Sequence, residues 1–274
     1  MTVDTKVWLI TGANSGFGHA IAEAASQQGD RVVATARNPS GLDDALVLDV
    51  HQPESVERAV QATIARHGRI DVLVNNAGHG LIGAVEELVD EDLRLVLETN
   101  VFGVLRMTRA VLPHMRRQQS GHIVQMSSVG GMVANPGHAA YATSKFALEG
   151  LSEALAAEVE PWGIGVTIVE PGPFRTDFAG RSIHRAAQLD AYRDTPAGRL
   201  RDRFANQDGQ QPNDPALAAK AILEAVNTPG SPLRLPLGPE AIGRIRAKLT
   251  DQLDQLERLP RSAHETAFSD EATG

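Results

Sequence analysis

Apolar and polar residues follow one another in blocks along most of this chain. Between short apolar runs that are typical of strands, apolar residues recur every three or four positions, the spacing of one face of a helix. Strands that alternate with helices form parallel βαβ units, so the pattern predicts one doubly wound parallel α/β sheet with helices on both faces. The predicted strands are Val7–Ile10, Arg31–Ala36, Ala45–Val50, Val72–Val74, His122–Met126, Gly165–Val169 and Leu233–Leu237. The predicted helices cover residues 20–28, 53–68, 90–116, 139–162 and 214–227.

The later part of the chain departs from this pattern. Residues 177–211 are polar, contain many arginines and have weak periodicity. A stretch this long inside a compact domain is usually a lid or a flexible segment. An amphipathic helix is expected over residues 239–259, within an extension of residues 239–274 whose last dozen residues we expect to be mobile. No internal repeat or linker is present, so residues 1–274 predict a single domain with a core over about residues 5–235.

Composition and charge exclude several classes of protein. A chain of 274 residues with 42% hydrophobic residues can bury one large core. The net charge of -8 argues against a nucleic-acid partner, because no basic block is available to bind phosphates. The N-terminal MTVDTK has no signal pattern and no apolar run approaches a membrane span, so we expect a cytoplasmic protein. With no cysteine and nine scattered histidines, a metal site is not indicated, although carboxylate sites stay open.

A glycine-rich turn follows the first predicted strand. The segment TGANSGFG, residues 11–18, runs from that strand into a helical pattern. Gly12, Gly16 and Gly18 let the backbone turn tightly and approach a pyrophosphate, which would rest on the amides at the helix start. The spacing G-x-x-x-G-x-G differs from the more common G-x-G-x-x-G. A tight strand-to-helix connection is the alternative interpretation, but the position of the turn favours nucleotide binding.

The end of the second predicted strand bears on the choice of cofactor. In dinucleotide-binding folds an acid at this place holds the ribose hydroxyls, whereas a basic residue accepts the 2′-phosphate of NADP. Arg37 stands there with no acid beside it, which favours NADP over NAD unless Asp43 or Asp44 folds back. Asp49, at the end of the third strand, could accept a hydrogen bond from the adenine amino group or cap the next helix.

The candidate chemistry lies in residues 125–146, QMSSVGGMVANPGHAAYATSKF. Tyr141 and Lys145 are four positions apart, so on a helix they share one face, and a nearby ammonium group would lower the pKa of the phenol. Ser128 follows a predicted strand and could present its hydroxyl to the same point. Two hydroxyls and a cation would then converge on one substrate oxygen. A tyrosine at a helix start is by itself more often an ordinary partly buried residue, and the neighbouring motifs give the catalytic interpretation its weight.

Several other positions stand out. Asn100 is polar on the apolar stripe of a predicted helix, and periodicity alone favours a buried, hydrogen-bonding role. NNAG, residues 75–78, and EPGPFRT, residues 170–176, each follow a strand at the edge where such folds bind ligands. Candidate residues for an apolar substrate pocket, or for ordinary packing under the lid, are Leu81, Ile82, Val129, Met132, Val133, Phe174 and Phe178.

Taken together, TGANSGFG, NNAG, Ser128, Tyr141-Ala-Thr-Ser-Lys145 and PGPFRT resemble the short-chain dehydrogenase/reductase family over about residues 5–235. The resemblance implies a Rossmann fold of seven strands and a nicotinamide cofactor. It implies Tyr141 as general acid/base, Ser128 as the residue that orients the substrate oxygen, Lys145 as the group that lowers the tyrosine pKa and holds the nicotinamide ribose, and Asn100 as support for a proton relay. The expected cofactor-binding residues are Gly12, Asn14, Ser15, Gly16, Phe17, Gly18, Arg37, Asp49, Val50, Asn76, Ala77, Gly78, Tyr141, Lys145, Pro171, Gly172, Phe174 and Thr176. EPGPFRTDF and the extended C-terminus are similar to the 17β-hydroxysteroid and retinol dehydrogenase-like branch.

Three functions are compatible with these motifs. The first is an NADP(H)-dependent oxidoreductase, with NAD(H) possible, that interconverts a small hydrophobic ketone or aldehyde and its alcohol. The second is a non-catalytic protein that senses the cofactor and binds a partner on the same fold. The third is a sugar-nucleotide epimerase or dehydratase, which the glycine spacing and the small C-terminal region disfavour. Apolar residues on more than one face of the two long predicted helices favour a homodimer or homotetramer.

Overall fold

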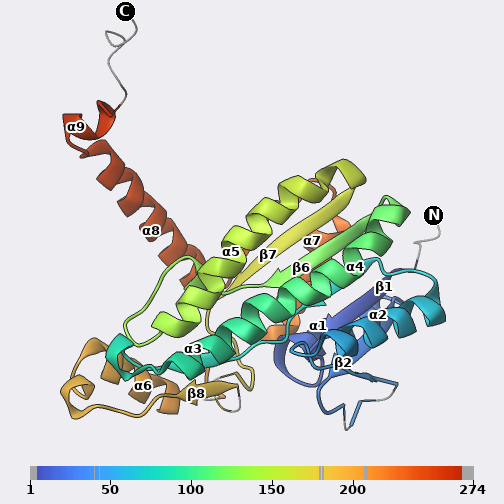
Figure 1. Ribbon diagram of the computed structural model, residues 1–274, viewed down its shortest axis with the longest axis horizontal. Coiled ribbons are helices and arrows are strands. Elements are labelled where there is room, and N and C mark those ends of the chain that lie inside the picture. The colour runs from blue at the N-terminus through green and yellow to red at the C-terminus, as the bar shows by residue number, and fades with distance from the viewer. Residues whose placement is uncertain are drawn as a thin grey trace, which may run out of the picture.

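The computed structural model describes residues 5–39, 41–42, 44–178, 180, 182–206 and 209–266. Figure 1 shows one sheet between layers of helices, with the last helices projecting from the body. Two expectations fall outside the described residues, the role of Asp43 and most of the C-terminal segment predicted to be mobile.

Seven parallel strands form the sheet, as the pattern and the resemblance predict. Their order is β3-β2-β1-β4-β6-β7-β9, with the crossover between β1 and β4 that marks a doubly wound fold. The strands are β1 Val7–Thr11, β2 Arg31–Ala36, β3 Leu46–Val47, β4 Val72–Asn75, β6 Gly121–Met126, β7 Ile164–Pro171 and β9 Arg234–Leu237. The third strand is shorter than predicted, because the chain turns after Leu48 and Asp49 bonds locally to His51 and Ser55.

Helices cover both faces of the sheet because alternate residues of each strand point to opposite sides. Leu9 of β1 faces one core, to which α2 Pro53–His67, α4 Val104–Gln118 and α5 Ala139–Val159 contribute. Trp8 and Ile10 face the other core, with α1 Gly16–Gln27 and α7 Pro215–Asn227. The two layers explain why the strands read as continuous apolar runs.

The helix predicted over residues 90–116 is interrupted in the middle. It consists of α3 Asp90–Leu97, a π-helical turn at Glu98–Gly103 and α4. Gly103 packs closely against Val50, where an added Cβ would lie 2.7 Å from a Val50 methyl group. Wide turns of this kind are rare and frequently occur at functional sites. Asn100 lies within this turn.

Much of the polar stretch 177–211 is folded onto the body. It contains β8 Ile183–Arg185, which pairs with β5 Gly80–Ile82, a short turn at Asp190–Tyr192, and α6 Pro196–Asn206. Glu87, on the short η1 turn Val85–Glu87, anchors it by accepting hydrogen bonds from Leu189 N (2.9 Å) and from Arg201 (3.1 Å). Burial opposes ionisation of Glu87, but these bonds and that from Ala84 lower its pKa. The role of this segment as a lid stays a prediction.

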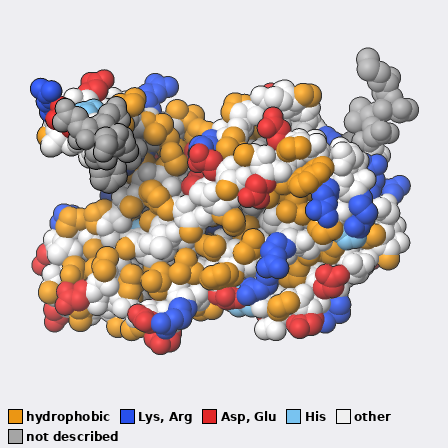
Figure 2. Space-filling model, turned by 45° about the horizontal axis from the view of Figure 1, so that its top comes forward, with side chains coloured by type: hydrophobic (Ala, Val, Ile, Leu, Met, Phe, Trp, Pro, Cys, Tyr) orange, Lys and Arg blue, Asp and Glu red, His pale blue; other side chains and the backbone are white. Residues whose placement is uncertain are grey.

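The last helices leave the body of the domain, as Figure 1 shows. They are α8 Pro239–Glu257 and α9 Arg261–His264. Figure 2 shows hydrophobic side chains spread across one face of the molecule between charged groups. Across the described residues, every helix is too short or too polar to cross a bilayer.

Close backbone packing at the glycine turn provides a test of stability. A Cβ added at Gly18 would lie 2.4 Å from the Gly12 carbonyl oxygen and 2.5 Å from Asn76 Nδ2. Gly18→Ala should lower the free energy of unfolding by about 1–3 kcal/mol. Gly150→Ala on α5, where nothing lies within 4 Å, should instead raise it by up to about 1 kcal/mol. Urea unfolding followed by tryptophan fluorescence compares the two, and equal stabilities would contradict the prediction.

Candidate active site

The carboxyl ends of β1, β4, β6 and β7 meet at one edge of the sheet, where open α/β folds bind ligands. The glycine turn follows β1, the NNAG segment overlaps the end of β4, Ser127 and Ser128 follow β6, and Pro171 ends β7. The first half of α5 lies against this edge through its contacts with residues 129–131. The fold therefore brings together most of the motifs that are far apart in the sequence.

Tyr141 and Lys145 occupy one buried face of α5, as their spacing predicts. The Lys145 ammonium group donates a hydrogen bond to the Met126 carbonyl oxygen (2.7 Å) and lies 5.6 Å from the centre of the Tyr141 ring. Ser128 hydrogen-bonds to the tyrosine hydroxyl and accepts a bond from Gly130 N (3.0 Å). Two hydroxyls and one cation thus lie within a single small region.

Burial dominates the electrostatics of this group. Burial raises the pKa of Tyr141 to about 12, and only the Ser128 hydrogen bond opposes that rise. Burial also lowers the pKa of Lys145 to about 8, with Glu149 acting in the opposite direction. Burial outweighs the Ser128 hydrogen bond, because the phenolate loses its solvation. The lowering of the phenol pKa by Lys145 stays a prediction.

Asn100 is fully buried and uses both ends of its amide. Its Oδ1 accepts a hydrogen bond from His79 N (3.1 Å), and its Nδ2 donates to His79 O and to Ser144 Oγ, both at 2.9 Å. Ser144 in turn donates to the Tyr141 carbonyl oxygen (2.7 Å). These bonds agree with the hydrogen-bonding role that periodicity favours, and they connect the π-helical turn to the start of α5. The proton-relay role of Asn100 stays a prediction.

The glycine turn has the features of a phosphate cradle. Gly12 and Gly16 have φ angles of 65° and 55°, which favour glycine, and a Cβ at Gly16 would come within 3.3 Å of Thr176. Ser15, which caps α1, makes no side-chain bond to the first turn. The first amides of α1 are thus not used by the capping residue, as a bound phosphate requires. Asn76 ties this turn to β4 by donating to Thr11 O (2.9 Å) and Gly12 O (3.0 Å).

The residues expected on the adenosine side lie at the ends of β2 and β3. Arg37 is exposed directly after β2. Asp44 pairs with Arg66 at 2.9 Å, so it does not fold back toward Arg37. Asp49 accepts a bond from His51 N (3.0 Å), which occupies one carboxylate oxygen. Their cofactor contacts stay predictions.

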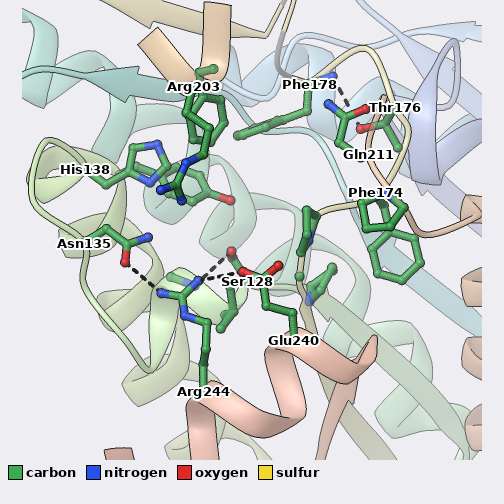
Figure 3. Close-up of a pocket in the computed structure, with 18 of the residues that line it drawn as sticks. Ser128, Asn135, His138, Phe174, Thr176, Phe178, Arg203, Gln211, Glu240 and Arg244 are labelled. Carbon is green, nitrogen blue, oxygen red and sulfur yellow. Dashed lines mark hydrogen bonds and ion pairs between the residues drawn. The ribbon is translucent and has the colours of Figure 1, made fainter. Parts of the chain in front are cut away.

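A cavity of about 480 Å³ opens between the strand ends, α6 and the first turns of α8 (Figure 3). Of the predicted site residues, it is lined by Phe17, Ser128, Tyr141, Pro171, Gly172, Phe174 and Thr176. Residues that sequence reasoning missed also line it: Asn135, His138, Leu200, Arg203, Phe204, Gln210, Gln211, Pro212, Glu240 and Arg244. Most of these lie on segments without a motif, so only their position in space could identify them.

The predicted apolar pocket is partly wrong. Val129, Phe174 and Phe178 line the cavity, but the other four candidates do not. Leu81 packs with Val96 and Ala140 in a separate cluster and Ile82 is fully buried. Met132 and Val133 pack under α8. The predicted catalytic residues Asn100 and Lys145 lie outside the cavity lining. So do the remaining predicted cofactor-binding residues, which are Gly12, Asn14, Ser15, Gly16, Gly18, Arg37, Asp49, Val50, Asn76, Ala77 and Gly78.

The cavity wall combines aromatic and charged groups. The His138 ring lies 5.6 Å from Tyr141 and 4.9 Å from Phe204, and burial lowers the His138 pKa to about 4, so that it is neutral at pH 7. Arg244 reaches Asn135 Oδ1 (2.8 Å) and Glu240 (3.5 Å) within the cavity wall. Across the described part of the chain, no three or more histidine, aspartate or glutamate side chains gather as a metal site would require.

A buried charged cluster lies beneath Ser127 and Lys145. Ser127 donates to Glu149 (2.5 Å), and Arg234 lies 3.3 Å from Glu149 and 3.5 Å from Glu170. Burial and the neighbouring Glu149 raise the pKa of Glu170 to about 7, against the effect of Arg234. Sequence reasoning missed this cluster, whose one local signal is the carboxylate of Glu170 at the end of a buried strand.

Comparison with known proteins identifies the family to which the chain belongs. The model of the short chain dehydrogenase family matches residues 6–186, and the chain belongs to this family of oxidoreductases. A 3-ketodihydrosphingosine reductase of Bacteroides thetaiotaomicron is 41% identical over 239 residues, covering 85% of this chain and 88% of that protein. Retinol dehydrogenase 8 of Bos taurus is 36% identical over 253 residues, covering 82% and 79%. This likeness agrees with the predicted branch.

Solved structures show the same architecture. A short-chain dehydrogenase from Streptomyces avermitilis superposes with a TM-score of 0.91 at 44% identity, covering 97% of this chain and all of that one. A 3-ketoacyl-(acyl-carrier-protein) reductase from Brucella melitensis, complexed with NADH, superposes with a TM-score of 0.71 at 26% identity, covering 85% and 96%. The predicted fold is confirmed.

The Glu170 carboxyl group predicts an unusual pH dependence of stability. Because its folded pKa, about 7, lies above the ordinary value of 4.5, the folded state binds more protons in between, and stability falls as pH rises from 4.5 to 7. Glu170→Gln should reduce this pH-dependent loss in the free energy of unfolding by up to about 3 kcal/mol. Glu153→Gln, an exposed partner of the same Arg234, should leave it unchanged. Urea unfolding at pH 5 to 8 measures both, and a constant difference between wild type and Glu170→Gln would refute the prediction.

Proposed function

We propose that this protein is an NADP(H)-dependent oxidoreductase that interconverts a hydrophobic ketone or aldehyde and its alcohol. The observation that carries the proposal is that the Tyr141 and Ser128 side chains line one cavity beside the glycine turn, with the Lys145 ammonium group 5.6 Å from the centre of the Tyr141 ring. When bound, a nicotinamide cofactor supplies or accepts the hydride. Gly12, Gly16 and the first amides of α1 would hold its phosphates, and Lys145 would hold its nicotinamide ribose.

The three side chains have distinct tasks in this proposal. Tyr141, whose pKa is raised to about 12, keeps its proton at neutral pH and donates it to the substrate oxygen during reduction. Ser128 orients that oxygen through its hydroxyl. Lys145, with a pKa near 8, remains mostly protonated at pH 7 and stabilises the negative charge that develops on the phenol oxygen. Asn100 holds the backbone of Tyr141 through Ser144.

The cavity lining supports the proposed substrate class. Phe17, Phe174, Phe178, Leu200 and Phe204 supply apolar surface that suits a hydrocarbon body. Retinol and 3-ketodihydrosphingosine, the compounds in the names of two relatives, are consistent with such a substrate. A screen of apolar ketones, aldehydes and alcohols with both cofactors, followed at 340 nm, would identify it.

We also propose a homodimer or homotetramer. Leu95 on α3, Phe102 in the π-helical turn and Phe146 on α5 each expose more than two fifths of their surface. Large apolar residues on adjoining elements favour a partner surface. A non-catalytic cofactor-sensing protein is the alternative function. It is less well supported, because it leaves unexplained why two hydroxyls line the cavity beside a buried lysine.

The chain has two tyrosines, which makes a matched test of the proton donor. Tyr141→Phe should lower kcat by at least about 100-fold, the lower end of what a general acid contributes. Cofactor binding, measured by quenching of tryptophan fluorescence, should persist. Tyr192→Phe, which removes an exposed hydroxyl bonded to Glu86, should retain full activity. Substantial turnover by Tyr141→Phe would exclude the proposed role.

The preference for NADP can be tested at β2. Removing a charge-assisted hydrogen bond to the 2′-phosphate costs about 1.5–3 kcal/mol, so Arg37→Ala should weaken NADPH binding by about 10- to 100-fold and leave NADH binding unchanged. Arg31→Ala, an exposed arginine at the other end of the same strand, serves as the control. Titration calorimetry with both cofactors gives the ratio of the NADH and NADPH dissociation constants for each variant. Tighter binding of NADH than NADPH by the wild-type protein would overturn the assignment.

A further inference from the structure

The α8 helix is longer than the body of the domain that supports it. Near its start, Ala241 and Ile245 are buried against Val129, Met132 and Val133. From Leu249 onward every described residue of the chain is exposed. Figure 1 shows the outer part of α8 projecting away from the sheet and its covering helices. This part of the helix therefore has no packing partner within the described chain.

The apolar stripe of α8 nevertheless continues along the projecting part. Ile242, Leu249 and Leu256 follow one another at intervals of seven residues, and Leu253 lies beside them. Their exposed fractions are 43%, 45%, 59% and 61%. An apolar repeat of seven residues is the pattern by which two helices pack along a common seam. The stripe is a continuation of the buried face rather than a set of scattered surface residues.

Charges along α8 identify the partner. The inner half carries Arg246 and Lys248 in addition to the paired Glu240 and Arg244, whereas the outer half carries Asp251, Asp254 and Glu257. In a parallel pair of α8 helices, the two basic halves would face each other and so would the two acidic halves, and both contacts would be repulsive. In an antiparallel pair, the basic half of one helix lies along the acidic half of the other. A surface that is complementary to itself in this way fits a two-fold symmetric interface.

We propose that α8 pairs antiparallel with α8 of a second copy of this chain, across a two-fold axis near Gln252. Arg246 and Glu257 are eleven residues apart, close to three helical turns, so they lie on the same side of the stripe. With the axis midway between them, each Arg246 faces the Glu257 of the other copy. The exposed leucines then cover one another.

The pairing also connects the two copies to their cavities. Glu240 and Arg244, at the inner end of α8, line the cavity, and Ile245 packs with Val129, the residue after Ser128. Covering the outer stripe holds the whole helix in place, and with it one wall of the site. A lipid surface is a poorer occupant, because three carboxylates lie on the projecting part and anionic membranes attract basic helices.

The chain contains no cysteine, so a single introduced cysteine reports on this interface alone. Gln252→Cys, beside the axis and next to the stripe, should form a disulfide-linked dimer rapidly under mild oxidation. Asp251→Cys lies at the same height on the far side of the helix and should cross-link no faster than by random collision. Far-UV circular dichroism verifies that both variants are folded. Equal rates for the two variants would overturn the proposal.

A charge swap tests the antiparallel direction. In the Gln252→Cys background, Arg246→Glu or Glu257→Arg alone should slow cross-linking by about tenfold, because symmetry removes two ion pairs at once. The double swap should restore the original rate, whereas failure to restore it would exclude the proposed register. Flotation of the wild-type chain with phosphatidylcholine and phosphatidylserine vesicles, lost in Leu253→Glu and without rapid cross-linking, would instead assign the stripe to a membrane. None of these measurements depends on enzyme activity, so they are independent of the proposed reaction.

Discussion

The first half of α5 buries polar side chains where a helix packed on a sheet normally buries apolar ones. Tyr141, Ser144, Lys145 and Glu149 are all removed from water, which is costly unless each finds a partner. Lys145 is held by the Met126 carbonyl, Ser144 by Asn100, and Glu149 by Ser127 and Arg234. The requirement to satisfy this face fixes α5 against the ends of β6 and β7, and it places the reactive groups at the edge of the sheet.

The same burial determines how the groups ionise. A phenol without solvent keeps its proton, a buried ammonium group holds its proton less strongly, and a carboxyl group near another carboxylate is protonated near neutral pH. At neutral pH a protonated phenol therefore lies beside a cation, above a buried cluster of opposite charges. This state suits reduction of a carbonyl group, in which the substrate oxygen must receive a proton.

Much of the wall of the proposed substrate cavity comes from parts of the chain that lie far from these motifs. The cavity wall is built by α6, by the loop that follows β7 and by the inner end of α8. Glu87 anchors the segment before α6, and α8 extends from the cavity to the proposed contact with a second copy. The proposed substrate cavity and the proposed contact between copies thus share one helix, while Tyr141 and Ser128 lie at the edge of the sheet.

Local signals in the sequence determined the seven strands, the glycine turn and the shared face of Tyr141 and Lys145, because these follow from a fixed number of residues per turn or per strand. Tertiary structure alone decided the π-helical turn at Asn100, the anchoring by Glu87, the cavity wall with His138, Arg203 and Arg244, and the upward shift of the Tyr141 pKa. Each of these depends on contacts between residues distant in the chain or on the loss of solvent, and neither leaves a regular spacing in the sequence.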